Sequence, residues 1–409
     1  MATSRKHPVS RRGFMAGTTA LAAGTLGFPA IGGAQAATVK VGLIHPVTGF
    51  VAYNGQQGRL GATMAIEDVN KAGGIKAMGG ARLEALLGDS QSKVEVGVSE
   101  VEKMNGAGVA AYIGCFQSPV GIAASQAASK YGTPFLIDVG ASDQLVTRGL
   151  KNTFRLMPGF GVSVEQGISS LGALNNAANG VAKSAVIVHE SGEFGTGTAK
   201  LLASKLPSIG ISVKEVIGHD NPTRNFDNIA LRIRSMAPDL VMMSNYQNEY
   251  MLLARTLHQQ KVNLAGFFSI LGGGFNYKFV KEMPDVAQYM MDVNHWFNPK
   301  SAKAQALKKR VEAGGALFTF EVYLAYSTVM LLAQSLEHAG SADKEKLTAA
   351  IAGSTFNAEL MPYRETRFVN GQNQGARPAV LQALKGDIQV IGPEDVASAK
   401  AVFPRPKFT

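Results

Sequence analysis

The stretch YIGCFQSPVGIAAS, Tyr112–Ser125, contains a complete β–α unit. An apolar run ends at Gly114–Cys115, a short polar turn follows, and small apolar residues then recur at helical spacing. Ser118 followed by Pro119 predicts a helix start, because serine accepts bonds from the first amides and proline has no amide to leave unsatisfied. A strand that leads into such a turn also presents backbone donors and a positive helix end to an anion. The unit therefore predicts either an ordinary cap or an anion site at Ser118.

Strands and helices alternate on both sides of this unit. Val39–His45 predicts a first strand, and Gly58–Gly74 predicts a helix that ends at a glycine. RLEALLGDS predicts the second strand and Val94–Asn105 the second helix, while Pro134–Gly140 predicts a fourth strand after the opening unit. Strands that alternate with helices of this length indicate a parallel, doubly wound sheet.

The same pattern restarts after an extended segment at Asn152–Gly159. A helix is expected from Val162, and four more strands follow, each separated by a helix: SAVIVHES, SVKEVIGH, DLVMMSN and AGFFSIL. The rhythm then changes, because Tyr289–Trp296 is extended and the chain ends in a hairpin with a turn at Lys385–Asp387. Three helices lie between these segments, near residues 301–314, 319–338 and 343–352. Two sheet domains are expected, with ligands beyond the carboxyl ends of the strands.

The first 36 residues predict export. Arg11 and Arg12 precede a weakly apolar, Gly/Ala-rich stretch, and AQA at Ala34–Ala36 supplies the small residues of a cleavage site. A basic start, a short apolar core and an A-x-A end are typical of a signal peptide and not of a spanning helix. The arginine pair resembles a twin-arginine (Tat) signal. We therefore expect residues 1–36 to be removed during export to the periplasm, and no lipid anchor, because no cysteine precedes Cys115.

The composition after this segment argues against several classes of protein. The 40 basic residues less the four in the leader leave 36 against 30 acidic residues, a net charge of +6 over 373 residues. The only basic run is LKKR, so nucleic-acid binding is not expected. A single cysteine allows no internal disulfide, and no apolar stretch reaches the ~18–20 residues of a membrane span. The length suits two domains.

The motifs of common enzymes are missing. The chain has no GxxxxGK[ST] and no GxSxG, and HESGE at His189–Glu193 lacks the second histidine of a zinc site. Its seven histidines form no ligand-spaced pair, and one cysteine excludes CxxC. GEFGTGTA is interpreted as a tight turn that opens a helix. We therefore expect no catalytic residues, no metal and no cofactor.

The segment VKVGLIHPVTGFVAYNGQQGRLGATMAIEDVNKAGGI resembles the opening of the leucine/isoleucine/valine-binding family, the type I solute receptors of ABC transporters. Further segments continue the resemblance in order: AYIGCFQSPVGIAAS, GTPFLIDVGASDQLVTRG, NTFRLMPG, VIVHESGEFGTG, APDLVMMSNYQNE and YLAYSTVMLLAQSLEHAGS. It covers nearly all of Val39–Pro393. The resemblance implies an α/β fold of two Rossmann-like, doubly wound lobes joined by three crossover strands, near Met157–Gly159, Asn294–Phe297 and Met361–Thr366.

The resemblance also implies domain bounds and partners. Residues 38–158 with 296–362 would form the N-terminal lobe, and residues 159–295 with 363–409 the C-terminal lobe. The lobes of such receptors close on a ligand by hinge motion, and the closed form is recognised by an inner-membrane ABC permease. Closure requires that the ligand contact both lobes, because it cannot shift the equilibrium by more than its differential affinity. A monomer is expected.

The site residues implied by the resemblance fall into two groups. The ligand carboxylate would be held by the helix start at Ser118 and by the Gly140–Ala141–Ser142 segment, with serine in place of the family's threonine, and with Gln117 beside them. The body of the ligand would contact Tyr53, Asn54, Phe160, Phe194, Phe268 and Trp296. Each of these phenylalanines has core packing as its alternative role.

Departures from the family pattern concern the ligand's ammonium. The acidic residues that hold it in amino-acid receptors align with Phe160 and Phe268, and a buried ammonium without a partner would cost several kcal/mol. The sequence therefore favours a receptor for a small carboxylate, an aromatic or other apolar organic acid. Two alternatives remain: an amino-acid receptor in which Glu249 or Asp138 holds the ammonium, and a ligand-sensing module for a membrane signalling partner.

Overall fold

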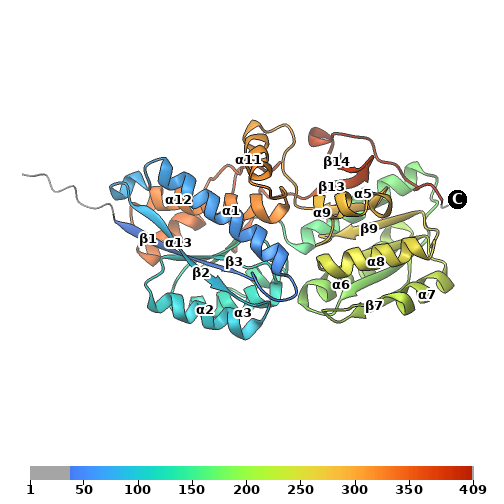
Figure 1. Cartoon of the computed structure of the whole chain (residues 1–409), viewed down its shortest axis with the longest axis horizontal. Coiled ribbons are helices and arrows are strands. Elements are labelled where there is room, and N and C mark those ends of the chain that lie inside the picture. The colour runs from blue at the N-terminus through green and yellow to red at the C-terminus, as the bar shows by residue number, and fades with distance from the viewer. Residues whose placement is uncertain (1–36, 408–409) are drawn as a thin grey trace, which may run out of the picture. The chain divides into compact units, whose positions relative to one another are not determined.

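The computed structural model describes residues 37–407, so the expected signal peptide, with Arg11 and Arg12, lies outside the described residues. Two seven-stranded, mostly parallel sheets form the core of this part, each flanked by helices (Figure 1). We call each sheet with its helices a lobe. The predicted α/β fold of two doubly wound lobes is confirmed.

The first lobe is built on a sheet of order β11-β12-β5-β4-β3-β1-β2. Its strands are β1 (Thr38–His45), β2 (Arg82–Asp89), β3 (Ala111–Gly114), β4 (Phe135–Ile137), β5 (Thr153–Arg155), β11 (Phe368–Val369) and β12 (Gln372–Asn373). The strands β1 to β5 pair in parallel, and β11 pairs antiparallel to β12. The fully buried side chains of β3 and β4 are typical of central parallel strands.

The second lobe repeats this architecture with the order β14-β13-β10-β9-β8-β6-β7. Its strands are β6 (Ser184–Glu190), β7 (Ser212–His219), β8 (Leu240–Ser244), β9 (Gly266–Ile270), β10 (Met291–Asn294), β13 (Ala379–Leu384) and β14 (Asp387–Gly392). The hairpin β13–β14 carries Lys385 (φ 54°) and Gly386 (φ 77°) between the paired Leu384 and Asp387. Two positive φ angles identify a type I′ turn, so the hairpin expected from the sequence is confirmed.

Helices follow most of the strands, as the alternating pattern predicts. They are α1 (Ala52–Lys71), α2 (Val94–Gly106), α3 (Ser118–Ser129), α4 (Gln144–Thr147), α5 (Phe160–Ala177), α6 (Glu193–Lys205), α7 (Asp227–Met236), α8 (Gln247–Gln259), α9 (Tyr277–Glu282), α10 (Pro284–Ala287), α11 (Ala302–Ala313), α12 (Phe320–Ala339) and α13 (Lys344–Ala352), with 3₁₀ turns η1 (Lys76–Met78), η2 (Leu206–Ile209) and η3 (Glu394–Val396). Within residues 37–407, no helix is both long and apolar enough to cross a bilayer.

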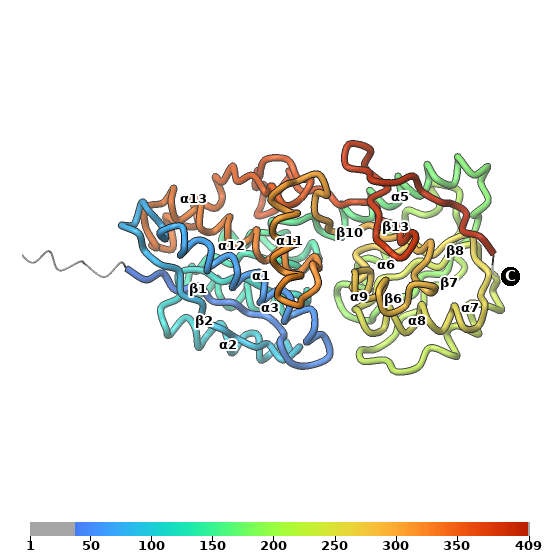
Figure 2. The backbone as a smooth tube through the Cα atoms, turned by 45° about the horizontal axis from the view of Figure 1, so that its top comes forward, coloured from blue at the N-terminus to red at the C-terminus, as the bar shows by residue number. Residues whose placement is uncertain are grey.

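A glycine brings α1 and α12 into close contact, and the two helices lie side by side in both backbone views (Figure 2). A Cβ atom on Gly61 would lie 2.0 Å from the carbonyl oxygen of Val322, so a larger residue cannot occupy this position without moving a helix. This packing fixes the first turn of α12, which carries Phe320 and Glu321 into the interior.

The chain passes between the sheets three times. The first passage lies between β5 and α5, and the second follows β10. The sequence places the third near Met361–Thr366, which is wrong: β12 still pairs with β5, at Gln372 opposite Arg155, so the passage comes between Asn373 and Ala379. The two-residue strands β11 and β12 are too short to produce an alternating pattern.

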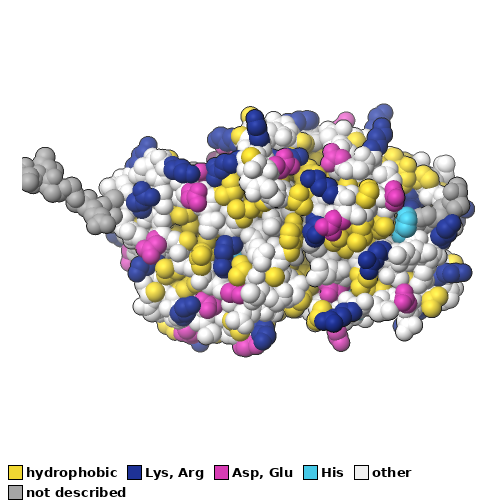
Figure 3. All heavy atoms as spheres, viewed as in Figure 1, with side chains coloured by type: hydrophobic (Ala, Val, Ile, Leu, Met, Phe, Trp, Pro, Cys, Tyr) yellow, Lys and Arg dark blue, Asp and Glu magenta, His cyan; other side chains and the backbone are white. Residues whose placement is uncertain are grey.

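Charged side chains are spread over the visible surface. In the space-filling view, Lys and Arg are interspersed with Asp and Glu, and no continuous basic stripe crosses this face (Figure 3). The low net charge read from the sequence is thus distributed and not concentrated there, which gives a nucleic-acid backbone no electrostatic track on that side.

Candidate functional site

A small cavity of about 30 Å³ lies where the carboxyl ends of strands from both sheets meet. Its lining residues lie at or shortly after the carboxyl ends of β3, β4, β6, β8, β9 and β10, or in the first turn of α12. This is the place expected for ligand sites in such sheets. The lining residues are Phe116, Ser118, Val139, Ala141, Phe194, Tyr246, Leu271, Gly273, Asn294, His295 and Phe320. The sequence predicted Ser118, Ala141 and Phe194 for the ligand site, and the structure brings these three together.

Ser118 lies in the first turn of α3 with a side chain only 1% exposed. Its Oγ accepts a hydrogen bond of 3.1 Å from the amide of Ser142, and α3 has no side-chain cap. The capping role considered for Ser118 is therefore wrong. A hydroxyl that accepts from Ser142 can still donate its own hydrogen, and the first amides of α3 have no partner within the helix. The site thus has donors and a positive helix end at one side.

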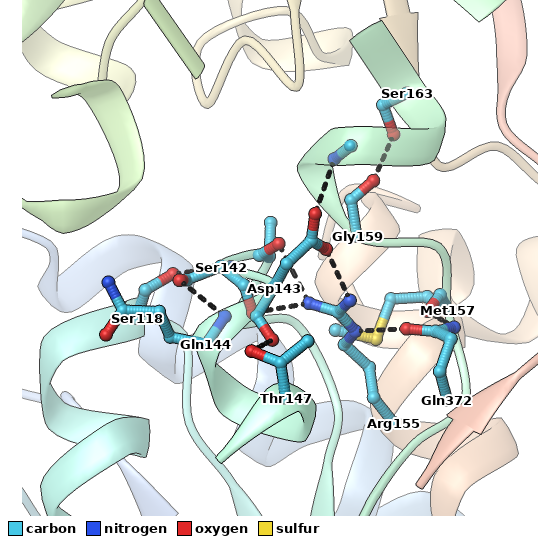
Figure 4. Close-up of polar contacts among 12 residues, drawn as sticks. Ser118, Ser142, Asp143, Gln144, Thr147, Arg155, Met157, Gly159, Ser163 and Gln372 are labelled. Carbon is cyan, nitrogen blue, oxygen red and sulfur yellow. Dashed lines mark hydrogen bonds and ion pairs between the residues drawn. The ribbon is translucent and has the colours of Figure 1, made fainter. Parts of the chain in front are cut away.

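Arg155 forms hydrogen bonds with the Ala141–Asp143 segment, which follows β4 and contributes to the cavity lining (Figure 4). This guanidinium, 1% exposed, donates through Nη1 to the carbonyls of Ala141 (2.8 Å) and Ser142 (2.7 Å). It also donates to Asp143 Oδ1 (2.8 Å) and to Gln372 Oε1 (2.7 Å). Burial lowers the pKa of Arg155, and the Asp143 carboxylate opposes this shift. Arg155 is therefore a positioning residue that holds the Ala141 segment in place.

Ser142 bonds away from the cavity, toward the second lobe. Its Oγ donates to Glu193 Oε1 at 2.9 Å, and Gln144 Nε2 donates to the same oxygen at 2.8 Å. Glu193 opens α6, so this contact joins the two lobes. Ser142 does not line the cavity, and its role as a carboxylate ligand remains a prediction.

Aromatic rings from both lobes surround Tyr246. The centroid of its ring lies 5.7 Å from that of Phe194, 5.8 Å from Phe116 and 5.9 Å from Phe50. Burial raises the pKa of Tyr246 well above its usual value, and the charges of nearby carboxylates add to the shift, so its hydroxyl stays protonated. Of these rings, Phe116, Phe194 and Tyr246 line the cavity and give it an apolar wall.

Two polar residues of the lining, Asn294 and His295, lie at the carboxyl end of β10. Asn294 donates to the Gly272 carbonyl (3.2 Å) and to Asp292 Oδ2 (2.7 Å), and its Oδ1 accepts from the His295 amide (2.8 Å). Burial and the positive charge of Arg155 lower the pKa of His295 to about 3, so its imidazole is neutral. The cavity lining therefore contains no Asp, Glu, Lys or Arg and no charged histidine at neutral pH.

Three of the predicted aromatic contacts are packed elsewhere. Phe160 opens α5 and packs against Gly197 of α6, where a Cβ atom would lie 2.7 Å from its ring. Phe268 is fully buried inside β9, and the residues after β9 that reach the cavity are Leu271 and Gly273. Trp296 packs against Tyr277 and Phe297, with ring centroids 5.5 Å apart in each pair. None of the three lines the cavity, so their contact with a ligand remains a prediction.

The remaining predicted residues lie around the cavity without lining it. The Gly140 amide donates to the Cys115 carbonyl (2.9 Å), and Gln117 lines a neighbouring cavity. The Tyr53 ring lies 5.7 Å from the ammonium of Lys278. The two alternative ammonium partners, Glu249 and Asp138, are also outside the lining.

Each of these two acids is buried in its own environment. Asp138 Oδ2 pairs with His45 Nε2 at 2.7 Å, and both side chains are at most 1% exposed. Burial raises the pKa of Glu249, the charge of Glu190 adds to it, and a bond from the Thr223 amide opposes it. Neither carboxylate faces the cavity, which leaves an ammonium group there without an ionic partner.

A chain of buried amides joins the lobes beside the cavity. Asn54 Nδ2 donates to Glu321 Oε1 of its own lobe (2.6 Å) and to Gln247 Oε1 of the other lobe (3.2 Å). The Gln247 oxygen also accepts from Asn276 Nδ2 at 3.0 Å. Asn54 was predicted to contact the ligand body; the structure assigns it a contact between lobes.

The carboxyl group of Glu321 makes the stability of the protein depend on pH. Burial raises its pKa from 4.5 to about 7, so between these values the native chain binds a proton that the unfolded chain has lost. The free energy of unfolding should therefore fall as the pH rises through this interval. Glu321→Gln keeps an acceptor for Asn54 and removes the titrating group. The free energy of unfolding of this variant should therefore fall less steeply with pH than that of the wild type.

Urea unfolding at pH 5 and pH 7.5 measures this difference. Asp292, whose pKa burial also raises to about 7, contributes to the slope that remains in the variant, together with Glu190 and Glu249, whose pKa values burial also raises. Equal slopes in the wild type and in Glu321→Gln would contradict the prediction.

Comparisons with known proteins agree with this architecture. A family model described as periplasmic binding protein matches residues 38–388. The leucine-, isoleucine-, valine-, threonine- and alanine-binding protein of Pseudomonas aeruginosa is 28% identical over 323 residues, which cover 78% of this chain and 83% of that protein. These matches extend over both lobes.

Solved structures show the same fold at lower identity. The branched-chain amino acid substrate-binding protein LivJ of Streptococcus pneumoniae, in complex with isoleucine, has a TM-score of 0.76 at 20% identity and covers 90% of this chain and 100% of its own. A solute-binding protein of an ABC transporter from R. palustris, in complex with benzoate, has a TM-score of 0.75 at 19% identity over 90% of this chain and 98% of its own. With the family match over both lobes, the chain belongs to the periplasmic binding protein family, in the branch of the leucine/isoleucine/valine-binding proteins of ABC transporters.

Proposed function

We propose that this protein captures a small carboxylate, an aromatic or other apolar organic acid, between its lobes and delivers it to an inner-membrane ABC permease. The observation that carries the proposal is the composition of the cavity: four aromatic rings and a hydroxyl at a helix start, with no acidic residue in the lining. Such a site favours an anion with an apolar body.

The two ends of the cavity recognise different parts of such a ligand. At one end, the Ser118 hydroxyl and the first amides of α3 favour a carboxylate, because donors and the helix dipole are already oriented. The apolar side chains of the lining, among them Phe194 and Phe320, exclude water from an apolar ring or chain. Burying ~100–150 Å² of ring surface is worth about 2.5–4 kcal/mol at ~25 cal/mol/Å² before ordering costs. An α-ammonium would be buried there without a partner.

The relatives support two ligand classes. The benzoate complex from R. palustris favours an aromatic acid, whereas the Pseudomonas aeruginosa protein and the isoleucine complex favour an amino acid. The acid-free lining of the cavity favours the first class. An amino-acid receptor remains the second candidate, and it would require Glu249 or Asp138 to turn toward the cavity.

The family of the protein and the sequence of residues 1–36 support a proposal for its location and export route. We propose a periplasmic monomer that is exported through the twin-arginine route by residues 1–36. Substitution of both Arg11 and Arg12 by lysine would then retain the precursor in the cytoplasm. Delivery of the ligand state to a membrane signalling partner is the alternative to delivery of the ligand to a permease.

Calorimetry with the protein purified from the periplasm tests the function. We expect a member of a panel of aromatic and aliphatic carboxylates to bind more tightly than leucine, isoleucine, valine or phenylalanine. Ser118→Ala should weaken the binding of that acid by roughly 1–3 kcal/mol, because the substitution removes a hydrogen-bond donor to the charged carboxylate. Ser129→Ala, at the exposed end of the same helix, should have no effect. Tight binding of leucine without a response to any amine-free acid would contradict the proposal.

A further inference from the structure

A second and larger cavity, of about 510 Å³, adjoins the first. It too lies between the lobes. Phe50, Gln117 and Pro119 line it from the first lobe, and Glu190, Ser191, Gly192, Asp220, Asn221 and Tyr246 line it from the second. Tyr246 lines both cavities, so a ligand whose body lies against this ring can place a substituent in the second cavity.

The polar groups of the second cavity are mainly hydrogen-bond acceptors. Its lining includes two carboxylates and two side-chain amides but no Lys or Arg. The Glu190 carboxylate, 1% exposed, already accepts from the amides of Gly192 and Gly195, each at 2.6 Å. An anion such as the ligand carboxylate would be repelled here, so the two cavities suit opposite ends of one molecule.

Two residues that line this cavity each have a buried amide oxygen without a hydrogen-bond partner among the described residues. Asn221 Nδ2 donates to Glu190 Oε2 at 3.0 Å, and because a carboxylate only accepts, this bond fixes which end of the amide is nitrogen. Its Oδ1 is buried and unbonded. Gln117, 4% exposed, likewise has a buried and unbonded Oε1. A buried acceptor without a donor costs free energy, which a donor on the ligand would recover.

We propose that this second cavity is a subsite for a neutral hydrogen-bond donor, such as a hydroxyl group, on the body of the carboxylate ligand. The inference rests on the proposed function and narrows its substrate class to hydroxylated apolar acids. Gln117 Oε1 and Asn221 Oδ1 accept from the donor. A methyl group of similar size would leave both oxygens unsatisfied, so the subsite discriminates by hydrogen bonding and not by volume.

Calorimetry with two matched pairs of acids tests the subsite: 4-hydroxybenzoate against 4-methylbenzoate, and 6-hydroxyhexanoate against heptanoate. In at least one pair, the hydroxylated acid should bind at least tenfold more tightly than its methyl counterpart. Gln117→Met and Asn221→Ala should each reduce this advantage to less than threefold, and in Asn221→Ala the affinity for the methyl acid should change less than threefold. Gln126→Met, at an exposed glutamine on α3, the helix that follows Gln117, is the control and should leave the advantage unchanged.

The outcomes separate the subsite from the function. If the methyl acids bind but the hydroxyl gives no advantage, or if the advantage survives in both variants, the subsite is wrong and the proposed function stands. If 4-(aminomethyl)benzoate binds more tightly than 4-hydroxybenzoate, the donor is a cation and the inference of a neutral donor is overturned. If no acid binds, the proposed function falls and the subsite falls with it. Melting temperatures within 3 °C of the wild type identify variants that have kept their fold.

Discussion

Leu271→Glu is expected to weaken the binding of an amine-free acid by 100-fold or more. Leu271 lines the cavity directly after β9, so the new carboxylate would share about 30 Å³ with the carboxylate of the ligand. Two such charges ~5 Å apart repel by roughly 3 kcal/mol at an effective dielectric constant of ~20, and each ~1.4 kcal/mol is tenfold in affinity. An amino acid would gain a partner for its ammonium, so leucine should bind the variant more tightly than it binds the wild type.

Leu271→Gln is the matched control for this prediction, because it has the shape of glutamate without the charge. Both variants should fold, since Leu271 already adopts a φ of 53° that glutamate tolerates no worse than leucine. Calorimetric titration with benzoate and with leucine measures both affinities. If the glutamine and glutamate variants lose the same affinity for the acid, the loss is steric and the argument from charge is refuted.

Arg155→Met should cause the largest loss of stability, about 3–5 kcal/mol, which is the range for breaking a buried ion pair. The substitution leaves the carbonyls of Ala141 and Ser142 without a donor and the Asp143 carboxylate without its cation. The pairing of β5 with β12 should also weaken, because Arg155 holds the Gln372 side chain.

Urea unfolding measures this loss, and two further variants control for it. Arg234→Met, on the exposed face of α7, should change stability by less than ~0.5 kcal/mol. Arg155→Lys keeps the charge but not the planar fork, so it should recover only part of the loss. A destabilisation below ~1 kcal/mol in Arg155→Met would show that the Ala141 segment keeps its position without the guanidinium.

The sequence predicts the fold well where the signal is local and repeated. The fully buried strand β8 and the long helix α12 produce apolar runs or periodic patterns that identify them directly. The turn between β13 and β14 was expected at Lys385–Asp387 because this segment separates two apolar runs, and the structure has positive φ angles at Lys385 and Gly386. The strands β11 and β12 form a short hairpin around Asn370 and Gly371, but their place in the first sheet depends on a distant contact. Pairing of Gln372 with Arg155 across 217 residues leaves no local trace.

The sequence likewise predicts those site residues that lie close to the ends of predicted strands and helices. Ser118, Ala141 and Phe194 lie within a few residues of a strand end and a helix start, which the pattern of apolar residues locates. The roles of His295 and Arg155 depend on tertiary contacts of the imidazole and of the guanidinium. The spacing of residues along the sequence does not reveal such contacts. The residue that reaches the cavity after β9 is Leu271 and not Phe268, because the strand continues two residues beyond Phe268 before the chain turns toward the cleft. An alternating pattern cannot specify where such a turn begins.

Several of the hydrogen bonds that join the lobes are made by side chains outside the small cavity. Asn54 with Gln247, and Ser142 and Gln144 with Glu193, bond across the cleft without belonging to the lining of the small cavity. The affinity for a ligand and the choice of ligand therefore depend on different residues, and each can change in evolution without the other. Under the proposed function, substitutions at these flanking positions would raise or lower the concentration at which a cell begins to scavenge a nutrient, while the lining of the cavity would set which nutrient is bound.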